Sequence, residues 1–405
     1  MREGWEYKKL GSFCKTGAGG TPLKSKKENY ENGTIPWLRS GEVNNRNITN
    51  CEIRITETGL NNSSAKLFPP RTVLIAMYGA TAGQVGILNF ECSTNQAVCG
   101  ILPNENFVPE FLYYFFLKFK EELIAQAVGG AQPNISQQKI KNTLIPNITL
   151  EEQKQIVTIL DKAFTAIDQA KANIEKNIEN AKELFQSKLN NIFSQKGDGW
   201  EIEKMVDVCS ILTCGVASTP KYVDEAVGVP FLSAQNVKNG KIILHKYKYI
   251  SQEFHKHLTK KNKPQKGDIL YSRVGAKFGE AGVVEHDFDF SVYVSVTLIR
   301  PLADKLNNYY LKYYLNSPLI KSLAKSSITS SGVPNLNVKT VREFPVHYPS
   351  IKKQLAIVKE IQNLEYAYIE IHKKYKQKIN SIEDLKKSIL QKAFAGELTE
   401  NAVVV

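Results

Sequence analysis

The sequence contains one pattern twice, and this internal repeat constrains the fold more than any other feature. Short motifs of the first half return in the same order roughly 200 residues later, beginning with Gly-Trp-Glu at positions 4–6 and 199–201. The other paired segments, first copy and then second copy, are 21–24 and 219–221, 35–43 and 229–237, 73–83 and 269–279, 130–135 and 332–336, and 144–153 and 344–354. Because the order is kept throughout, the chain is predicted to build one structural unit twice.

Each copy is predicted to be a mixed α/β domain followed by a long helix. Short apolar runs bounded by Gly and Pro, such as residues 72–77 and 268–272, are typical of strands. The segments 109–127 and 307–324 carry Tyr, Phe and Leu at helical spacing and are predicted to be core helices. The predicted organisation is a first domain at 1–150, a long helix at 151–195, a second domain at 196–350 and a second long helix at 351–400.

The two long stretches contain no Pro or Gly between 151 and 195 or between 351 and 395. Their apolar residues repeat with a period nearer 3.5 than 3.6, which is the pattern of helices that pack along a partner helix. At about 1.5 Å per residue, each helix would extend over roughly 60–65 Å. Two such helices of equal length are predicted to pair with each other, antiparallel, and to act as a spacer. The alternative is that they are ordinary amphipathic helices of a bundle.

The heptad pattern assigns two inward-facing rows to each long helix. For the first helix the rows are Val157, Phe164, Lys171, Ile178, Phe185 and Ile192, and Leu160, Ile167, Ile174, Ala181 and Lys188. For the second helix they are Ile361, Tyr368, Tyr375, Ile382 and Ile389, and Ile357, Leu364, Ile371, Lys378, Leu385 and Lys392. Lysines within a row weaken a simple apolar contact and can set the register of the pair.

Composition indicates a cytosolic protein with a polyanionic partner. No apolar run approaches the about 20 residues that cross a bilayer, and no C-x-x-C pair occurs among the six cysteines, so reduced thiols and no membrane are expected. The net charge is +13, of which residues 1–150 and 196–350 contribute +4 and +7, whereas 151–195 and 351–400 contribute −1 and +3. Charge concentrated on the two domains fits nucleic acid bound there. The alternative is a charge surplus that serves solubility.

Polar residues suited to base edges and phosphates follow the predicted strands of both copies. The candidate DNA-binding residues are Arg39, Ser40, Glu42, Asn44, Tyr78, Thr81, Gln84, Asn95 and Gln96 in the first copy, and Ser233, Gln235, Asn236, Ser272, Arg273 and Lys277 in the second. Arg can form two hydrogen bonds with guanine and Asn or Gln with adenine, while Glu accepts from cytosine. Lys and backbone amides suit phosphates. The alternative for any one of these residues is that it caps a turn.

The two copies keep their glycines but not these polar residues. Gly79 and Gly83 of the first copy return as Gly275 and Gly279 of the second, whereas the polar residues around them differ. The residues that recur are therefore interpreted as scaffold. Those that differ would read sequence, so each domain is predicted to read a different one.

The sequence lacks the motifs of common catalytic sites. The glycine-rich stretch 17–20 is not followed by the Lys-Ser/Thr of a phosphate-binding loop, and no Asn/Asp-Pro-Pro-aromatic motif of an amino-methyltransferase is present. His255 and His257 have no nearby Cys and lie in a Lys-rich segment, so a metal site is not expected. The chain is therefore predicted to bind a partner without catalytic or metal-binding residues of its own. A self-contained methyltransferase or nuclease is disfavoured.

At these segments the chain resembles the specificity (S) subunits of type I restriction-modification systems, over nearly its whole length. The resemblance rests on the Gly-Trp-Glu starts, on Pro-Trp-Leu-Arg-Ser-Gly-Glu-Val at 36–43 with its second copy at 230–237, on the Pro-Asn turns, and on residues 385–398 of the last helix. One segment departs from the pattern, because residues 293–297 match 93–96 poorly. The reading residues of that strand stay undetermined.

The resemblance implies two target-recognition domains joined by an antiparallel coiled coil with approximate two-fold symmetry. Members of the family bind double-stranded DNA at a bipartite, asymmetric site, and each domain reads one half. They recruit two methyltransferase (M) subunits, which bring S-adenosylmethionine, and two motor-nuclease (R) subunits, which use ATP and Mg²⁺. The chain itself is expected to hold no cofactor and to lie in the cytoplasm. The alternative is a coiled-coil scaffold whose basic domains bind protein or RNA.

Overall fold

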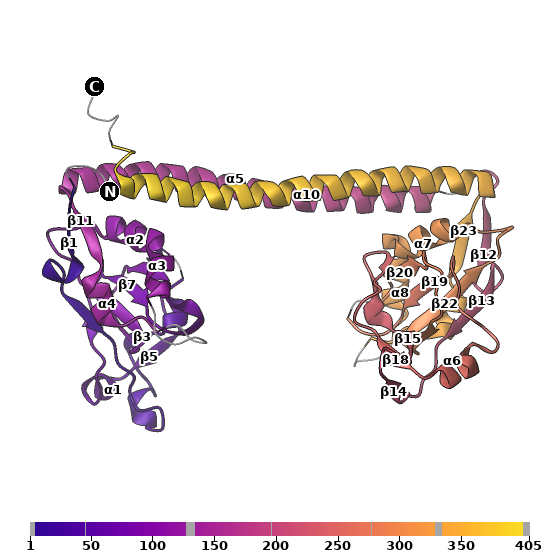
Figure 1. The fold of residues 1–405 in the computed structure, drawn as a ribbon, viewed down its shortest axis with the longest axis horizontal. Helices are drawn as coiled ribbons and strands as arrows, with labels where there is room; N and C mark the ends of the chain where they lie inside the picture. The colour runs from indigo at the N-terminus through magenta and orange to yellow at the C-terminus, as the bar shows by residue number, and fades with distance from the viewer. Residues whose placement is uncertain are drawn as a thin grey trace. The chain divides into compact units, whose positions relative to one another are not determined.

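The computed structural model describes residues 5–44, 46–126, 134–195, 197–276, 278–328 and 334–399. The chain forms two compact units, one of Met1–Ile174 with Gln377–Val405 and the other of Glu175–Lys376. Each unit contains one mixed α/β domain and a part of each of the two long helices (Figure 1). The predicted repeat is therefore a repeat of folded domains.

The first domain is built from two sheets and a separate two-stranded ribbon. The strand orders are β2-β10-β7-β8-β4 and β5-β3-β9-β6, and the ribbon pairs β1 with β11. The strands are β1 Glu6–Lys9, β2 Thr16–Ala18, β3 Ile35–Leu38, β4 Asn47–Ile48, β5 Ile53–Ile55, β6 Leu67–Phe68, β7 Val73–Ala76, β8 Val85–Leu88, β9 Cys92–Thr94, β10 Val98–Ile101 and β11 Leu144–Asn147. Buried β7, β8 and β10 are continuous apolar runs, as expected of strands covered on both faces.

Helices α2 Pro109–Lys118, α3 Lys120–Ala125 and α4 Gln137–Asn142 lie beside the larger sheet of the first domain, and α1 Glu57–Asn61 lies beside β5 of the smaller sheet. Phe111, Tyr114 and Phe115 of α2 are buried in a core that also contains Val73 and Ile75 of β7. Residues of both long helices complete the same core, so the domain is anchored to its part of the helix pair.

The second domain repeats the central strands of this arrangement. Its sheets have the orders β13-β22-β19-β20 and β14-β18-β15-β21, in which β13-β22-β19-β20 matches β2-β10-β7-β8 and β18-β15-β21 matches β5-β3-β9; β16 pairs with β17 separately, and the ribbon pairs β12 with β23. The strands are β12 Glu201–Lys204, β13 Cys209–Cys214, β14 Tyr222–Val223, β15 Val229–Leu232, β16 Val237–Lys238, β17 Lys241–Ile242, β18 Lys248–Ile250, β19 Ile269–Ser272, β20 Ala281–Val283, β21 Ser291–Val292, β22 Val296–Pro301 and β23 Pro345–Tyr348. The helices are α6 Gln252–Thr259, α7 Asn308–Asn316, α8 Pro318–Ser326 and α9 Val338–Arg342.

The core helices predicted at 109–127 and 307–324 are each two helices. In the second domain, α7 ends before Ser317, whose side chain accepts from the backbone N–H of Ile320 while Pro318 begins α8. Proline has no N–H to donate and favours the first turn of a new helix. In the first domain the break falls at Phe119, between α2 and α3, without a proline. The prediction of two unbroken helices was wrong in this respect.

The long helices are α5, Leu150–Ser194, and α10, Ile351–Ala395. In the first unit, Lys171 pairs with Glu383 and Asp168 pairs with Lys386, both at 2.7 Å. Residue numbers therefore increase along α5 in the direction in which they decrease along α10. In the second unit, the ring of Phe185 stacks on that of Tyr368 at 5.7 Å between centroids. The predicted antiparallel pairing is therefore confirmed within each unit.

The predicted rows hold in part for both long helices. On α5, Val157, Phe164, Leu160 and Ile167 are buried, but towards the end of the helix the predicted Lys188 is exposed and Leu189 is buried instead. On α10 the second row holds for Ile357 and Leu364, which are half-buried, but is wrong for Ile371 and Leu385, which are 42% and 48% exposed. The half-buried positions are His372, Ile379 and Lys386 instead. Two of these are polar, and Lys386 lies over the Phe164 ring while pairing with Asp168, so apolar spacing alone pointed to the wrong row.

A buried glutamine ties each domain to the start of its long helix. The Gln153 side chain accepts from the backbone N–H of Val108 and donates to the carbonyls of Asn106 and Ile148. Gln354 repeats all three contacts, accepting from Asn307 N–H and donating to the carbonyls of Lys305 and Pro349. Both side chains are fully buried. Because a buried backbone group without a partner is costly, these amides fix the chain path at both junctions.

Candidate nucleic-acid interface

Three polar loops of the first domain meet at one edge of its sheets. They follow β3, β7 and β9 and contain all nine candidate residues of the first copy. Strand β9 runs parallel to β3, with Leu38 opposite Thr94, and the N–H of Asn95 donates to the Leu38 carbonyl at 2.9 Å. The N–H of Met77 donates to the Ala97 carbonyl at 2.8 Å, which brings the loop after β7 to the same edge. The sequence-predicted residues of this domain are thus brought together.

Exposure divides these nine residues into two groups. Arg39, Asn44, Tyr78 and Gln96 are exposed, while Ser40, Glu42, Thr81, Gln84 and Asn95 are half-buried. The side-chain oxygens of Gln84 and Asn95 are enclosed and have no hydrogen-bond partner among the described residues. Those two oxygens cannot reach a base unless the loop moves. The exposed residues are the better placed readers.

Positive-φ glycines shape the loop after the central strand in both domains. Gly79 and Gly83 have φ of 71° and 77°, and Gly275 and Gly279 have φ of 98° and 82°. Only glycine adopts this conformation without strain, which explains why these positions recur. In both domains an asparagine pairs with this loop by an isolated β-bridge, Tyr78 with Asn134 and Val274 with Asn335. Residues 130–133 and 332–333 of the predicted turns lie outside the described residues.

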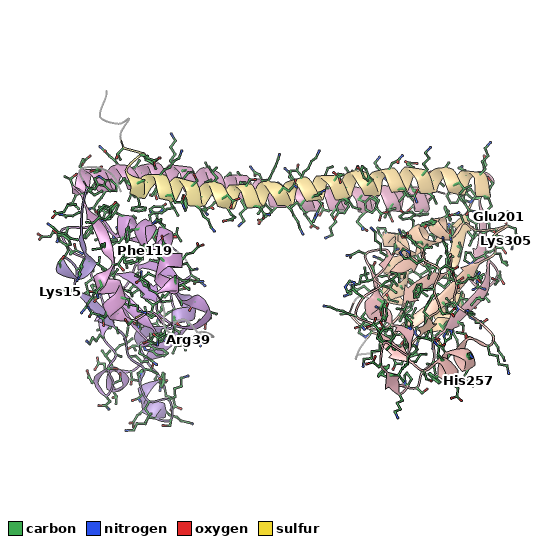
Figure 2. All side chains as sticks on the ribbon, viewed as in Figure 1. Lys15, Arg39, Phe119, Glu201, His257 and Lys305 are labelled. Atoms are coloured by element: carbon green, nitrogen blue, oxygen red, sulfur yellow. The ribbon has the colours of Figure 1, made fainter. Side chains whose placement is uncertain are left out.

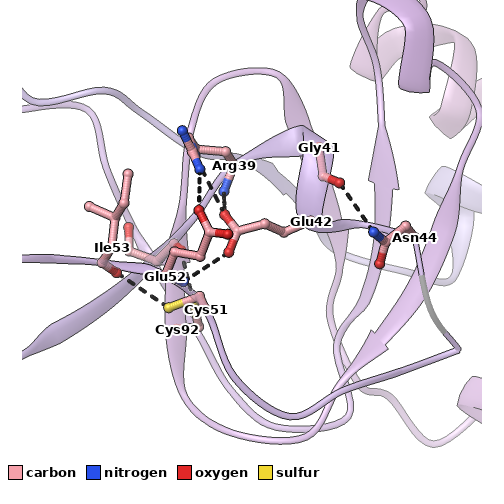
Figure 3. A network of polar contacts seen from close by, with 9 residues as sticks. Arg39, Gly41, Glu42, Asn44, Cys51, Glu52, Ile53 and Cys92 are labelled. Carbon is pink, nitrogen blue, oxygen red and sulfur yellow. Dashed lines mark hydrogen bonds and ion pairs between the residues drawn. The ribbon is translucent and has the colours of Figure 1, made fainter. Parts of the chain in front are cut away.

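In the first domain, a carboxylate network closes the loop after β3 (Figure 3). Glu42 accepts from the backbone N–H groups of Arg39 and Glu52, at 2.8 Å and 2.9 Å. Both oxygens of Glu42 are thus engaged within the loop. This geometry gives Glu42 a loop-bracing role beside the cytosine contact that was predicted for it. The Arg39 guanidinium in turn donates to Glu52 at 2.6 Å.

The matching loop of the second domain uses an amide in place of the carboxylate. Asn236 is buried, accepts from the Ser233 N–H at 3.0 Å and donates to the carbonyls of Ile243 and His245. Its position in the 3₁₀ turn is that of Glu42, and its role is the same. Gln235 is exposed, with its amide donating to the Lys246 carbonyl at 3.1 Å. Of these three predicted residues, Gln235 is the one presented to solvent.

The remaining candidates of the second domain are enclosed. Ser272 is fully buried and accepts from the Glu280 N–H at 3.0 Å. Arg273 is 8% exposed and donates to the Asn335 side chain at 3.2 Å. Both therefore hold the loop after β19 in the free chain, and base contact by either one stays a prediction. Lys277 lies outside the described residues.

Two residues of the second domain were missed from sequence. The N–H of Tyr293 donates to the Leu232 carbonyl, as that of Asn95 does to Leu38, so Tyr293 occupies the position of Asn95. Ser295 matches Ala97, accepts from the Arg273 N–H through its carbonyl and from the Ala234 N–H through its side chain. The poor match between 293–297 and 93–96 hid this correspondence, which backbone pairing reveals. Tyr293 is a half-buried aromatic residue at the interface edge.

A lysine-rich segment adjoins the interface of the second domain alone. Lys256, Lys260, Lys261 and Lys266 are exposed on and after α6. The equivalent segment of the first domain, from α1 to β6, carries Glu57 and Lys66 as its charged residues. Figure 2 shows Arg39 and His257 each on the part of its own domain away from the long helix. The segment is suited to phosphates.

Two cysteines lie beneath the loop after β3. A hydrogen bond with Cys92 lowers the pKa of the Cys51 thiol to about 7. Cys92 is buried, and the hydrogen bond with Cys51 together with burial raises its own pKa. In the second domain, burial lowers the pKa of His255, whose Nδ1 lies 2.9 Å from Ser291 Oγ. Among the described residues no three His, Cys, Asp or Glu side chains form a metal-binding group.

Comparison with known proteins identifies the family. The family described as the type I restriction modification DNA specificity domain matches residues 2–180 and 197–381. The EcoKI specificity subunit of Escherichia coli K12 is 26% identical over 98% of this chain and 90% of that protein. The MjaIX specificity subunit of Methanocaldococcus jannaschii is 25% identical over 97% of this chain and 93% of that protein.

Solved structures share the fold. A chain from a study of complex assembly and conformational transition of the type I restriction-modification system has a TM-score of 0.78 at 20% identity, covering 98% of this chain and 99% of the other. The HsdS subunit of Thermoanaerobacter tengcongensis has a TM-score of 0.57 at 19% identity, covering 97% of each chain.

The chain belongs to the specificity-subunit family of type I restriction-modification systems. It is a DNA-recognition component of a type I restriction enzyme, and not the catalytic one. Across the described residues, no helix is both long enough and apolar enough to span a bilayer.

Proposed function

We propose that this subunit selects a bipartite, asymmetric site in double-stranded DNA, with one half-site read by each domain. The observation that carries the proposal is a shared scaffold with different side chains in the same three loops. Arg39 corresponds to Ser233, Glu42 to Asn236 and Asn95 to Tyr293, because β15 pairs with β21 as β3 pairs with β9. Corresponding loops that present different hydrogen-bond donors and acceptors would select different bases.

The exposed loop residues are the proposed base contacts. In the first domain these are Arg39, Asn44, Tyr78 and Gln96, and in the second domain Gln235. The half-buried and buried candidates would fix the loops that present them. Exposed Lys260, Lys261 and Lys266 would bind phosphates beside the second half-site.

The two long helices would set the gap between the half-sites. Each is an unbroken helix of 45 residues, and a paired helix is far stiffer than a loop. One heptad advances a helix by about 10 Å, which is about three base pairs of duplex DNA. A change of one heptad would therefore change the gap without touching either set of loops.

Partner subunits would supply the chemistry. We propose that two M subunits, with S-adenosylmethionine, and two R subunits, with ATP and Mg²⁺, assemble on this chain in the cytoplasm. Exposed apolar residues on the long helices support a docking role, including Leu184 of α5 and Leu355, Tyr366 and Ile369 of α10, which are 44–69% exposed. Apolar patches of this kind mark interaction surfaces.

Genome-wide mapping of adenine methylation tests the proposal. The full chain, co-expressed with the methyltransferase subunit of its system, should produce one bipartite motif that disappears when this gene is deleted. Removing residues 172–178 of α5 together with the facing residues 376–382 of α10 should shorten the gap by about three base pairs and leave both half-sites unchanged. A motif with the original gap would contradict the spacer role. Binding that depends on salt but not on sequence would favour a scaffold for RNA or protein.

A further inference from the structure

Arg39 is held by two carboxylates at the point where three segments of the first domain meet (Figure 3). Arg39 follows β3, Glu42 ends the adjoining 3₁₀ turn and Glu52 precedes β5. The Glu52 carboxylate accepts from Nη2 of Arg39 at 2.6 Å, and Nε of Arg39 lies 3.7 Å from Glu42. Glu42 also binds the backbone of both other residues. The arginine is thus fixed at its backbone and at one side of its guanidinium.

The contact between Arg39 and Glu52 is not required for the fold. The Arg39 side chain is 47% exposed and that of Glu52 is 74% exposed. Ion pairs with this exposure contribute little to stability because water screens them. Glu42, at 18% exposure, does the bracing through backbone amides. The exposed Glu52 carboxylate is free to serve recognition.

The charge of the cluster selects the kind of ligand that Arg39 can bind. Two carboxylates outnumber one guanidinium, so the cluster carries a net negative charge at neutral pH. A phosphate approaching Arg39 is repelled by Glu42 and Glu52. The O6 and N7 atoms of guanine are uncharged acceptors and are not repelled in this way.

The free donors of Arg39 match that ligand. Its contacts to described residues use Nε and one proton of Nη2. A guanidinium has five N–H donors in a fixed plane, so both Nη1 protons and the second Nη2 proton stay available. One proton from each of Nη1 and Nη2 forms the pair that binds guanine O6 and N7.

We propose that Glu52 is a positioning residue for base recognition, which aligns Arg39 on a guanine of the first half-site and prevents it from binding phosphate. This inference rests on the proposed function and assigns one base of one half-site to one residue pair. The second domain has no such pair. Ser233 stands in the place of Arg39, and the pairing of β15 with β18 puts Tyr247 in the place of Glu52.

The test compares the motifs selected by full-length variants expressed with the methyltransferase subunit. In Arg39→Ala, one guanine position of one half-site should lose its preference by about tenfold or more, as expected for loss of a bidentate contact. Glu52→Gln should relax the same position, because the guanidinium is no longer aligned. Glu52→Asp keeps the charge and should retain most of the preference. All other positions, and the gap, should stay as in the wild type.

A binding assay on duplex DNA of unrelated sequence separates positioning from a structural role. Removing the Glu52 charge releases Arg39 to bind phosphate, so Glu52→Gln should bind such DNA more tightly and with a steeper salt dependence, by about one phosphate contact. A merely damaged loop would bind more weakly. Glu57→Gln, an exposed carboxylate at the start of α1 in the same domain, is the matched control and should change neither measurement.

Three outcomes would overturn the inference. The first is an unchanged preference at every position in both Arg39→Ala and Glu52→Gln. The second is an even loss of preference over both half-sites, with a lowered thermal unfolding temperature, which would make Glu52 structural. The third is the absence of any bipartite motif in the wild type, and that result would overturn the proposed function itself.

Discussion

The two domains of this subunit agree where each joins its long helices and differ in the side chains exposed at the interface edge. Gln153 and Gln354 make the same three hydrogen bonds, and Phe394 and Phe193 pack on corresponding helices, α2 and α7. At the loops, by contrast, the Arg39–Glu52 pair of the first domain has no counterpart in the second. Duplication thus kept the frame and left the recognition edge free to change.

The largest expected effect is on the free energy of unfolding, from replacing the aromatic residues Phe193 and Phe394, which pack each domain against a long helix. It tests whether these contacts stabilise the two domains equally. Phe193 is fully buried between Tyr310 and Tyr314, and Phe394 is packed between Phe111 and Phe115. We expect Phe193→Ala and Phe394→Ala each to cost about 3–5 kcal/mol of unfolding free energy, from lost burial and the cavity left behind. Hydrogen exchange should place the loss in the second unit for Phe193 and in the first for Phe394.

Exposed leucines on the same helices are the controls for the aromatic anchors. Leu184→Ala on α5 and Leu385→Ala on α10 remove side chains that are 62% and 48% exposed, and each should cost less than about 1 kcal/mol. Clearly unequal losses of unfolding free energy in Phe193→Ala and Phe394→Ala would show that these contacts do not stabilise the two domains equally.

Replacing the buried glutamines Gln153 and Gln354 is expected to have the next largest effect on the free energy of unfolding. Gln153→Leu and Gln354→Leu remove a side chain that satisfies three backbone groups. We expect each to cost about 1–3 kcal/mol, because buried polar groups lose their partners. Denaturant titration of the full chain measures this. Gln155→Leu and Gln362→Leu, at exposed positions of the same helices, should be near neutral; losses equal to those of the buried pair would contradict the assignment.

The lysine-rich segment of the second domain tests the difference between the two surfaces. Replacing Lys260, Lys261 and Lys266 by Gln should lower the slope of log affinity against log salt by about 2–3, since each phosphate contact contributes about 0.9. Base preference should not change. A control of equal charge replaces Lys373, Lys374 and Lys376, which are exposed on α10. An equal change of slope in the control would indicate that net charge, and not this segment, governs binding.

The smallest effect concerns the Cys51 thiol, which only the first domain has at this loop. Its pKa is lowered to about 7, chiefly by the hydrogen bond with Cys92. Alkylation by iodoacetamide needs the thiolate, so the rate at Cys51 should rise through pH 7 and level off near pH 8. Mass spectrometry of labelled peptides measures the rate. Cys92→Ala removes the hydrogen bond and should shift the profile to higher pH; an unshifted profile would contradict that cause.

Much of the fold was predictable because the repeat and the helical periodicity are local patterns. The two domains and the pairing of two equal long helices follow from the repeat, and the inward row of Tyr368 and Ile382 follows from apolar spacing. The second row of α10 from Ile371 onward did not, because His372 and Lys386 occupy inward positions that apolar spacing assigns to Ile371 and Leu385. The break of the core helix at Phe119 also left no signal in the sequence.

The candidate site was predictable as a set of loops but not as a set of roles. Arg39 and Asn236 are both polar residues after a strand, yet one is exposed and the other is buried with its amide engaged. Glu52 precedes β5 and gives no sign in sequence of its contact with Arg39, 13 residues away. Backbone pairing also shows that Tyr293 occupies the place of Asn95, which the poor sequence match between 293–297 and 93–96 did not reveal.

The sequence by itself determined that one α/β unit is built twice, that each is followed by a long pairing helix, and that the chain is a type I specificity subunit. The first two properties depend on repetition and periodicity, and the third depends on motifs that resemble a known family; all three can be recognised in the linear sequence. Only the tertiary structure decided which polar side chains brace the loops and which face solvent. The reason is physical: a carboxylate, amide or guanidinium acquires its role from partners that strand pairing brings within hydrogen-bond distance, and these partners are distant in the chain.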